Sequence, residues 1–370
     1  MTRIEKVINF FFYISVILYM FSLSNIPFFF HTEYRNIIPV VLGLLAYLIY
    51  YYKLRKLPID SISSLLLVMI YIVFIVLFWK RFDIDWSLLS MLIYLPLISP
   101  ENKSFLRGLL SVKLFVLIVV IALSILGLIN DTSYVKLGGI SHSLGFFHPN
   151  TLGSVILSTF FDCFILFKNL RKQYFAFFLL VVLYVGYRLT FSRTFILMAG
   201  LGILIYLFRK RLSQRVINKF VFLVSAVGVY LFGTLYSMFY NPSNALYMQI
   251  DLLLTNRVRL GKLYIERYGF TPFPKSTPNI IPQGWWSADQ LFNDNTFLKF
   301  ALTQGVIIAG LFLLYILYIL GSKEYRLYNA LLILLAFLFL VIEAQGFYVF
   351  LLTPLLFKFM AVEDNSVKRI

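Results

Sequence analysis

Residues 108–129 read GLLSVKLFVLIVVIALSILGLI, and this apolar run decides the class of fold. It is long enough to cross a bilayer, which takes about twenty apolar residues for ~30 Å of hydrocarbon. Similar runs follow one another along most of the 370 residues. The chain is 61% hydrophobic and only 13% charged, with a mean hydropathy of +0.86. This composition is typical of an all-α polytopic membrane protein and excludes an ordinary soluble domain.

About twelve apolar segments are candidates for transmembrane helices. They cover residues 7–29, 37–52, 61–79, 86–99, 108–129, 151–168, 174–190, 194–208, 220–240, 296–320, 329–343 and 346–361. The first lacks a small-residue cleavage site, so we expect a membrane helix there and not a signal peptide. The segments at 37–52 and 86–99 are short for a span, so flanking Lys, Arg and Tyr side chains would have to reach the interface. Residues 1–370 are thus predicted to form a single integral membrane domain.

The net charge of +17 comes from cations that cluster between the apolar runs. With the N-terminus in the cytoplasm, about twenty Lys and Arg fall on the cytoplasmic side and about a dozen outside. The largest cytoplasmic cluster is Arg209, Lys210, Arg211, Arg215 and Lys219. Such placement indicates topology, with both termini cytoplasmic, and excludes a groove for nucleic acid. Cys163 is the only cysteine, so neither a disulfide within the chain nor a thiolate metal cluster is expected.

One polar interruption, residues 241–295, separates the ninth and tenth segments and is predicted to face outward. Connections in compact domains are usually short, so this loop is the first candidate for chemistry on a polar substrate. Residues 256–268 predict a short helix that Asn256 could cap, with Arg257 and Arg259 near its start. The helix either lies on the membrane surface or presents these arginines to an anionic substrate.

The end of this loop carries aromatic and acidic candidates. Trp285 and Trp286 form either an interfacial anchor, which we favour, or a surface on which a sugar stacks. Asp294 and Asn295 precede the tenth segment. Asp294 either caps that helix or accepts a proton from a sugar hydroxyl.

Two other helix ends on the predicted outer face carry candidate side chains. His148 and Asn150 precede the sixth segment. Asn150 is a candidate N-cap, and the helix N-terminus behind it could attract a phosphate oxygen. His148 either binds substrate or makes a structural hydrogen bond. Arg188 and Arg193 flank the joint between the seventh and eighth segments, where they either grip an anionic ligand or extend to the interface.

Three further acids carry weaker signals. Asp83 and Asp85 are spaced like the DxD pair with which many glycosyltransferases bind a divalent metal, but this spacing is common by chance. Asp162 lies about twelve residues into the sixth segment, near the middle of the membrane. An acid there is either functional or paired within the bundle, and we favour a structural hydrogen bond. No metal site is therefore predicted.

The order of these motifs resembles that of the Wzy-type polysaccharide repeat-unit polymerases and the related O-antigen ligases. The resemblance rests on Gly145-Phe-Phe-His148-Pro-Asn150, Ser192-Arg193-Thr194, Asn256-Arg257, and Asp294-Asn295-Thr296 before a helix that contains Gly305. It covers roughly residues 140–310. Ligases generally carry a histidine where this chain has Asp294-Asn295, so the chain looks more like polymerases of Gram-positive capsule or exopolysaccharide clusters.

The resemblance implies a metal-independent membrane glycosyltransferase of GT-C-like fold, without a cofactor. Such an enzyme polymerises oligosaccharide repeat units linked to a polyprenyl diphosphate, such as undecaprenyl diphosphate, at the outer face of the cytoplasmic membrane. Cations aimed at the departing diphosphate supply most of the catalysis. The candidates for that role are Arg193, Arg257, Arg259 and Arg188. The candidate catalytic acids and bases are Asp294 and His148, and the other substrate contacts are Asn150 and Asn295.

In this hypothesis the long loop is a lid over a floor of His148, Asn150 and Arg193. Two other classes stay open: a transporter, such as the lipid-linked oligosaccharide flippase of the same pathway, and a scaffold whose loop binds a protein. Transporters place charges near the midplane and often contain internal repeats. Here the charges gather at the predicted outer face, which favours an enzyme. A flippase and a chain-length regulator are its expected partners.

Overall fold

The computed structural model describes residues 3–27, 34–54, 59–78, 84–98, 103–136, 139–167, 172–254, 256–275, 294–343 and 347–361. Within these ranges the chain is predominantly helical, and six helices are long and apolar enough to cross a membrane. They are α1 (Arg3–Ser22), α6 (Lys103–Ile125), α7 (Pro149–Leu166), α8 (Lys172–Thr190), α11 (Lys219–Met238) and α14 (Thr296–Ser322). The coarse prediction of a helical multi-pass membrane protein is therefore confirmed.

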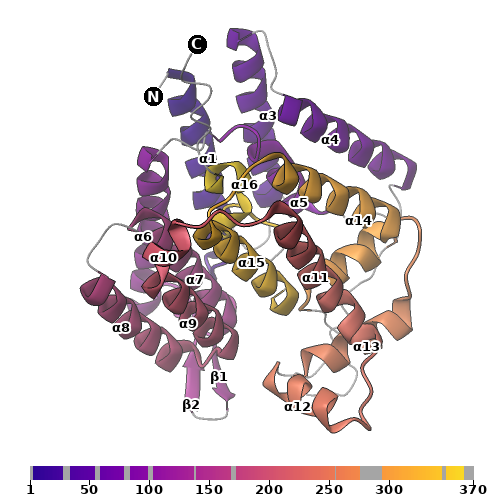
Figure 1. The fold of residues 1–370 in the computed structure, drawn as a ribbon. Helices are drawn as coiled ribbons and strands as arrows, with labels where there is room; N and C mark the ends of the chain where they lie inside the picture. The colour runs from indigo at the N-terminus through magenta and orange to yellow at the C-terminus, as the bar shows by residue number, and fades with distance from the viewer. Residues whose placement is uncertain are drawn as a thin grey trace.

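Further apolar helices complete the bundle. They are α3 (Tyr34–Leu54), α4 (Ile59–Phe78), α9 (Arg193–Leu207) and α15 (Leu327–Ile342). Helix α15 packs against α9, α11 and α14 and is buried along most of its length. In Figure 1 the loop helices α12 (Ala245–Leu253) and α13 (Arg257–Tyr268) lie at the lower end of the bundle, and α1 begins at the upper end. The two ends are called the loop end and the N-terminal end below.

Two predicted segments are wrong as single helices. At 86–99 the helix α5 (Trp86–Tyr94) stops after 9 residues, which rise only about 14 Å. At 346–361 the described part consists of turns, the 3-10 helix η2 (Thr353–Leu355) and the short helix α16 (Phe357–Met360). Both pieces are buried, and irregular backbone is tolerated at membrane depth only where protein surrounds it. The predicted count of about twelve spans is not confirmed.

A buried ion pair holds the irregular segment in place. Lys113 Nζ lies 2.8 Å from Asp162 Oδ2, and both side chains are fully buried. Lys113 also donates hydrogen bonds to the carbonyl of Leu351 (3.1 Å) and to the hydroxyl of Thr353 (3.3 Å). Thr353 in turn donates to Asp162. The structural hydrogen bond predicted for Asp162 is confirmed, with a lysine partner from the neighbouring helix α6.

A small antiparallel hairpin departs from the predicted all-α fold. Strands β1 (Ser133–Lys136) and β2 (Gly139–His142) connect α6 to α7, and β2 packs against α8. The hairpin extends from the loop end of the bundle in Figure 1, beside the start of α7. It therefore shares this end with the two loop helices.

Helix α14 is interrupted at Gly305, where a piece of the long loop inserts. Gly305 has φ +81°, and the backbone N–H of Val306 donates to the carbonyl of Thr271 at 2.9 Å. A β-carbon at position 305 would lie 2.6 Å from the carbonyl oxygen of Pro272. Glycine is needed here both for the left-handed backbone and for the close approach of the loop. The loop is thereby attached to the helix that follows it.

Candidate functional site

Arg257 is the centre of a buried polar cluster at the loop end of the bundle. Its Nε lies 3.1 Å from Asp294 Oδ2 and its Nη1 lies 2.9 Å from Glu343 Oε1. Nη1 also donates to the Thr194 hydroxyl (3.2 Å) and to the carbonyl of Ile342. We call Arg257, Asp294, Glu343 and Thr194 the arginine cluster. One guanidinium thus joins the starts of α13, α14 and α9 to the end of α15.

The start of α13 is positioned by a residue that the sequence did not single out. Asp251 Oδ1 accepts hydrogen bonds from the backbone N–H groups of Val258 (2.9 Å) and Arg259 (3.0 Å). Asn256 instead adopts a left-handed conformation, with φ 64°, and its side chain makes no capping hydrogen bond. The predicted side-chain cap by Asn256 is therefore wrong. Asp251 satisfies the free N–H groups of this helix and fixes the turn that carries Arg257.

Protein covers one face of α13. Val258, Gly261 and Tyr264 are buried, and the helix packs against α11 and α14. Leu263 of the same helix is 40% exposed. Protein therefore covers the face that holds Tyr264, and the alternative of a helix on the membrane surface rests on the exposed Leu263.

At the start of α14, one residue caps the helix and the residue before it pairs with Arg257. Asn295 Oδ1 accepts a hydrogen bond from the backbone N–H of Leu298 (3.0 Å), and its Nδ2 donates to the carbonyl of Gly233 (2.7 Å). Asn295 is therefore the N-cap, and the alternative in which Asp294 caps the helix is wrong. Asp294 lies one residue earlier, and its carboxylate faces Arg257.

The cluster holds one guanidinium between two carboxylates. Burial raises the pKa of both Asp294 and Glu343, and attraction to Arg257 offsets this only in part. Burial would lower the pKa of Arg257, but the two carboxylates outweigh it and raise that pKa. Two carboxylates carry more negative charge than one guanidinium neutralises. One of the two therefore binds a proton more easily than an isolated carboxylate does. The Asp294 side chain is 26% exposed and that of Glu343 only 6%, so Asp294 is the accessible one.

A cavity of about 20 Å³ adjoins the guanidinium. Its lining includes Tyr236, Ser237, Leu254, Asn295 and Val341. This volume accommodates about one water molecule and is far too small for a sugar. A large substrate would therefore approach the cluster from the exposed edge of Asp294.

The other predicted arginines do not join the cluster. Arg193 donates to the carbonyl of Leu252 at 3.2 Å, and the Arg188 guanidinium lies 5.8 Å from the centre of the Phe191 ring. Arg259 lies two positions after Arg257 on α13, and successive helical positions point in different directions. All three side chains are exposed, and none forms an ion pair within the described residues. The predicted diphosphate set is thus split into one buried and three exposed arginines.

His148, not Asn150, is the N-cap of α7, so the predicted cap is wrong. His148 Nδ1 accepts a hydrogen bond from the backbone N–H of Asn150 at 3.0 Å. A neutral imidazole that accepts at Nδ1 carries its proton on Nε2. In this state His148 is a hydrogen-bond donor and not a base. Its ring also lies 4.8 Å from the ring of Tyr134 on β1.

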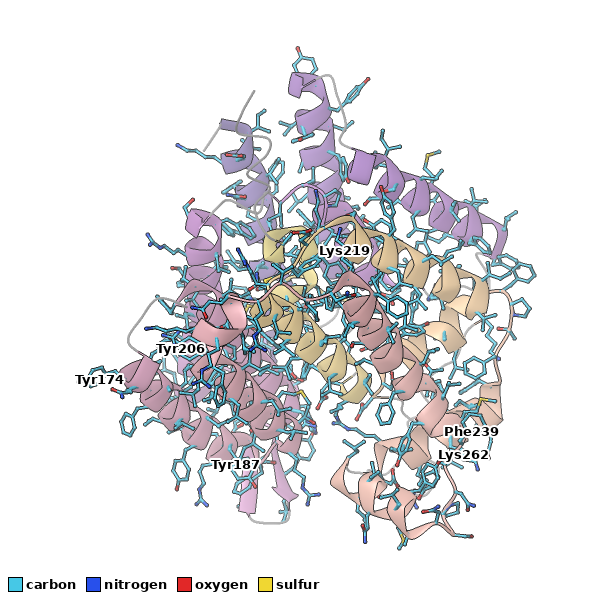
Figure 2. The ribbon with its side chains drawn as sticks, viewed as in Figure 1. Tyr174, Tyr187, Tyr206, Lys219, Phe239 and Lys262 are labelled. Carbon is cyan, nitrogen blue, oxygen red and sulfur yellow. The ribbon has the colours of Figure 1, made fainter. Side chains whose placement is uncertain are left out.

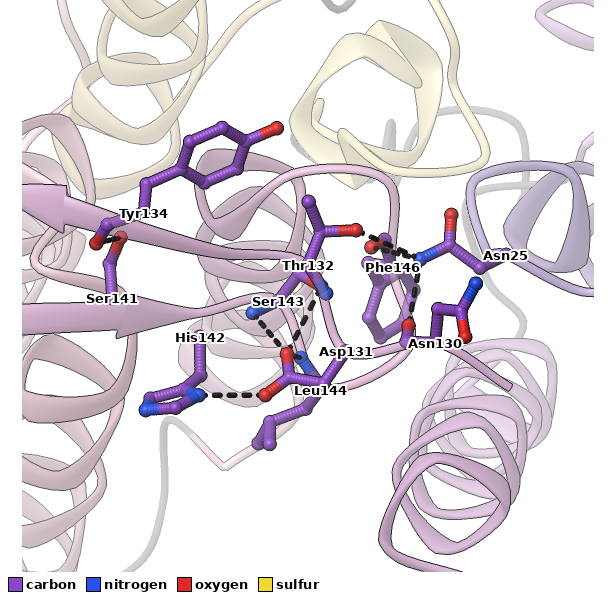
Figure 3. Close-up of polar contacts among 10 residues, drawn as sticks. All are labelled: Asn25, Asn130, Asp131, Thr132, Tyr134, Ser141, His142, Ser143, Leu144 and Phe146. Atoms are coloured by element: carbon purple, nitrogen blue, oxygen red, sulfur yellow. Dashed lines mark hydrogen bonds and ion pairs between the residues drawn. The ribbon is translucent and has the colours of Figure 1, made fainter. Parts of the chain in front are cut away.

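A second histidine, His142, is held by Asp131 at the base of the hairpin (Figure 3). His142 Nδ1 lies 2.7 Å from Asp131 Oδ2, while Oδ1 accepts from the backbone N–H of Ser143 at 2.9 Å. Burial alone would raise the pKa of Asp131, but the hydrogen bonds from His142 and the backbone outweigh it and lower that pKa. His142 pairs with Ser133, one register position from Tyr134, so it lies on the opposite face of the hairpin from the Tyr134–His148 contact.

The remaining predictions concern the metal pair and the tryptophans. Asp85 caps α5, because its Oδ1 accepts from the backbone N–H groups of Ser87 (3.0 Å) and Leu88 (3.1 Å). Asp83, Trp285 and Trp286 lie outside the described residues. Among the residues that are described, no group of three or more His, Cys, Asp or Glu side chains is arranged to hold a metal ion.

Sequence reasoning missed Glu343 and Asp251. Glu343 follows the apolar segment that became α15, just as Asp294 precedes the one that became α14. A carboxylate at the end of an apolar run was therefore the signal in the sequence that could have indicated Glu343.

Comparisons of the chain with protein-family models, with curated proteins and with solved structures returned no match.

Proposed function

We propose that the chain is a membrane glycosyltransferase that polymerises polyprenyl-diphosphate-linked oligosaccharide repeat units into a surface polysaccharide. In this proposal the fold is GT-C-like, both termini are cytoplasmic, and the loop end faces outward from the cell membrane. The arginine cluster carries the proposal. It combines a cation and two carboxylates at one end of an apolar bundle, which suits a reaction with an anionic leaving group and a hydroxyl nucleophile.

Arg257 would stabilise the diphosphate as the bond from the anomeric carbon to its oxygen breaks. The contacts of Arg257 with Asp294, Glu343 and Thr194 use Nε and Nη1, so Nη2 would be the nitrogen that donates to a substrate oxygen. A fixed donor aimed at developing charge contributes about 10²–10³ in rate. Arg193, Arg259 and Arg188 would attract the substrate from the exposed surface, since their side chains are not committed to carboxylates.

Asp294 would take the proton from the acceptor hydroxyl as its oxygen attacks the anomeric carbon. Its raised pKa and partial exposure suit a general base better than the buried Glu343. Glu343 would instead orient Arg257. His148 would donate from Nε2 to a substrate oxygen, and Asn150, in the first turn of α7, would be a further substrate contact. Asn295 would hold the start of α14.

The test is product analysis with purified protein in liposomes and a radiolabelled polyprenyl-diphosphate-linked repeat unit. A ladder of lengthened glycans, with release of polyprenyl diphosphate, supports the proposal. Transfer of one glycan to a distinct acceptor would instead indicate an O-antigen-ligase-like enzyme. Movement of the lipid across the bilayer without new glycosidic bonds would indicate a flippase or other transporter, and neither activity would favour a scaffold. A flippase and a chain-length regulator of the same pathway are the proposed protein partners.

A further inference from the structure

Two basic segments that lie far apart in the sequence are joined at the N-terminal end of the bundle. The first contains α10 (Arg209–Ser213) and runs to the start of α11, and the second connects α14 to α15. The backbone N–H of Ile217 donates to the carbonyl of Tyr325 at 3.1 Å, and the backbone N–H of Leu327 donates to the carbonyl of Arg215 at 2.8 Å. A β-bridge pairs Val216 with Arg326 between these bonds. The two segments therefore form one surface.

Six cations of this surface are exposed, and we call them the basic patch. They are Lys210, Arg211, Arg215, Lys219, Lys323 and Arg326. Glu324 is the exposed acid beside them, and none of the six forms an ion pair with a described carboxylate. Arg209 is excluded, because it is buried and its guanidinium lies 4.1 Å from the centre of the Tyr206 ring. Like charges gathered in this way repel one another unless anions neutralise them.

The basic patch lies where four apolar helices end. Helices α9 and α14 finish beside it and α11 and α15 begin beside it, so it lies at the level of the lipid headgroups. Lys219 is at the opposite end of α11 from Phe239 in Figure 2. Phe208 and Phe220, which flank the patch in sequence, are 56% and 74% exposed. Exposed aromatic side chains next to cations are typical of the boundary between headgroups and acyl chains.

We propose that the basic patch is a binding site for the headgroups of anionic phospholipids in the same bilayer. The cations supply the attraction to lipid phosphates, and Phe208 and Phe220 enter the adjoining acyl region. A bilayer is the occupant that contacts both kinds of side chain at once, since a soluble anion would not cover exposed phenylalanines. The inference does not depend on the proposed glycosyltransferase activity, because the patch is at the other end of the bundle from the arginine cluster.

The experiment is native mass spectrometry of the full chain in neutral detergent, titrated with phosphatidylglycerol or phosphatidylcholine. We expect tighter binding of phosphatidylglycerol. The double variant Arg211→Gln/Arg215→Gln should weaken it by on the order of tenfold, since each cation near a membrane surface contributes attraction to anionic lipid. The matched control is Lys6→Gln/Arg107→Gln, which removes the same charge at exposed positions outside the patch. It should weaken binding several-fold less than the patch variant, because these two cations are not part of the group of six.

Three outcomes would overturn the proposal. They are equal binding of the two lipids by the unaltered protein, an equal loss in both double variants, and displacement of phosphatidylglycerol by millimolar inorganic phosphate. The last result would mean that the patch is a site for free phosphate. Binding is read without turnover, so a failed glycosyl-transfer assay would leave this result standing.

Discussion

Replacing Arg257 by alanine should destabilise the protein strongly, because the cation between two carboxylates is lost. The Arg257 side chain is 9% exposed, and its partner Glu343 is 6% exposed. Breaking a buried ion pair by removing one partner costs about 3–5 kcal/mol. Glu343→Ala should cost less, about 1–3 kcal/mol, because Arg257 keeps Asp294 at 3.1 Å.

The assay is a double-mutant cycle on the free energy of unfolding, measured by titrating SDS into mixed micelles. We expect Arg257→Ala/Glu343→Ala to be less destabilised than the sum of the single variants, by about 1–3 kcal/mol. Arg259→Ala is the control, since this exposed arginine is on the same helix and should change stability by less than about 0.5 kcal/mol. Additive effects of the Arg257 and Glu343 substitutions would refute the arginine cluster as described.

Two further predictions concern the start of α14 and its break at Gly305. Gly305→Ala should lower the free energy of unfolding by at least about 1–3 kcal/mol, because φ is +81° and the new β-carbon would meet Pro272. Gly310→Ala, with nothing within 4 Å, is the control and should be neutral or slightly stabilising. Glycosyl-transfer activity should rise with pH as Asp294 ionises, with a midpoint above the ordinary value of 3.8. Asp294→Asn should abolish this acid limb, and a limb that persists in the variant would show that another group titrates.

The helices that face lipid could be predicted from sequence, because continuous apolar runs are the direct signal for a span. Helix α5 and the segment after Glu343 could not be distinguished from membrane-spanning helices by sequence. Their side chains are as apolar as those of spans, but they are buried in protein, and hydropathy does not distinguish a protein neighbour from a lipid neighbour. The interaction of Lys113 with Asp162 was similarly hidden, because their separation in sequence says nothing about which helices pack together.

The candidate site was predictable residue by residue but not as an arrangement. Arg257 and Asp294 were both expected at the site, and the structure joins them. Their partner Glu343 was missed because it comes after a different helix. Arg259 was predicted to bind the diphosphate together with Arg257, although positions two apart on a helix point to different sides. At the starts of α7 and α14, the side chain that caps lies within two positions of the candidate cap. His148 caps α7 and not Asn150, and Asn295 caps α14 and not Asp294.

The most direct test of the central claim is the rate of polymer formation by purified Arg257→Ala and Arg257→Lys in liposomes with a lipid-linked repeat unit. Rates are compared per folded protein, at a temperature where both variants remain folded. We predict that alanine lowers the rate by about 10²–10³ and that lysine restores only part of it, because an ammonium lacks the planar fork of the guanidinium. A folded Arg257→Ala protein that forms polymer of normal length at the normal rate would contradict the account.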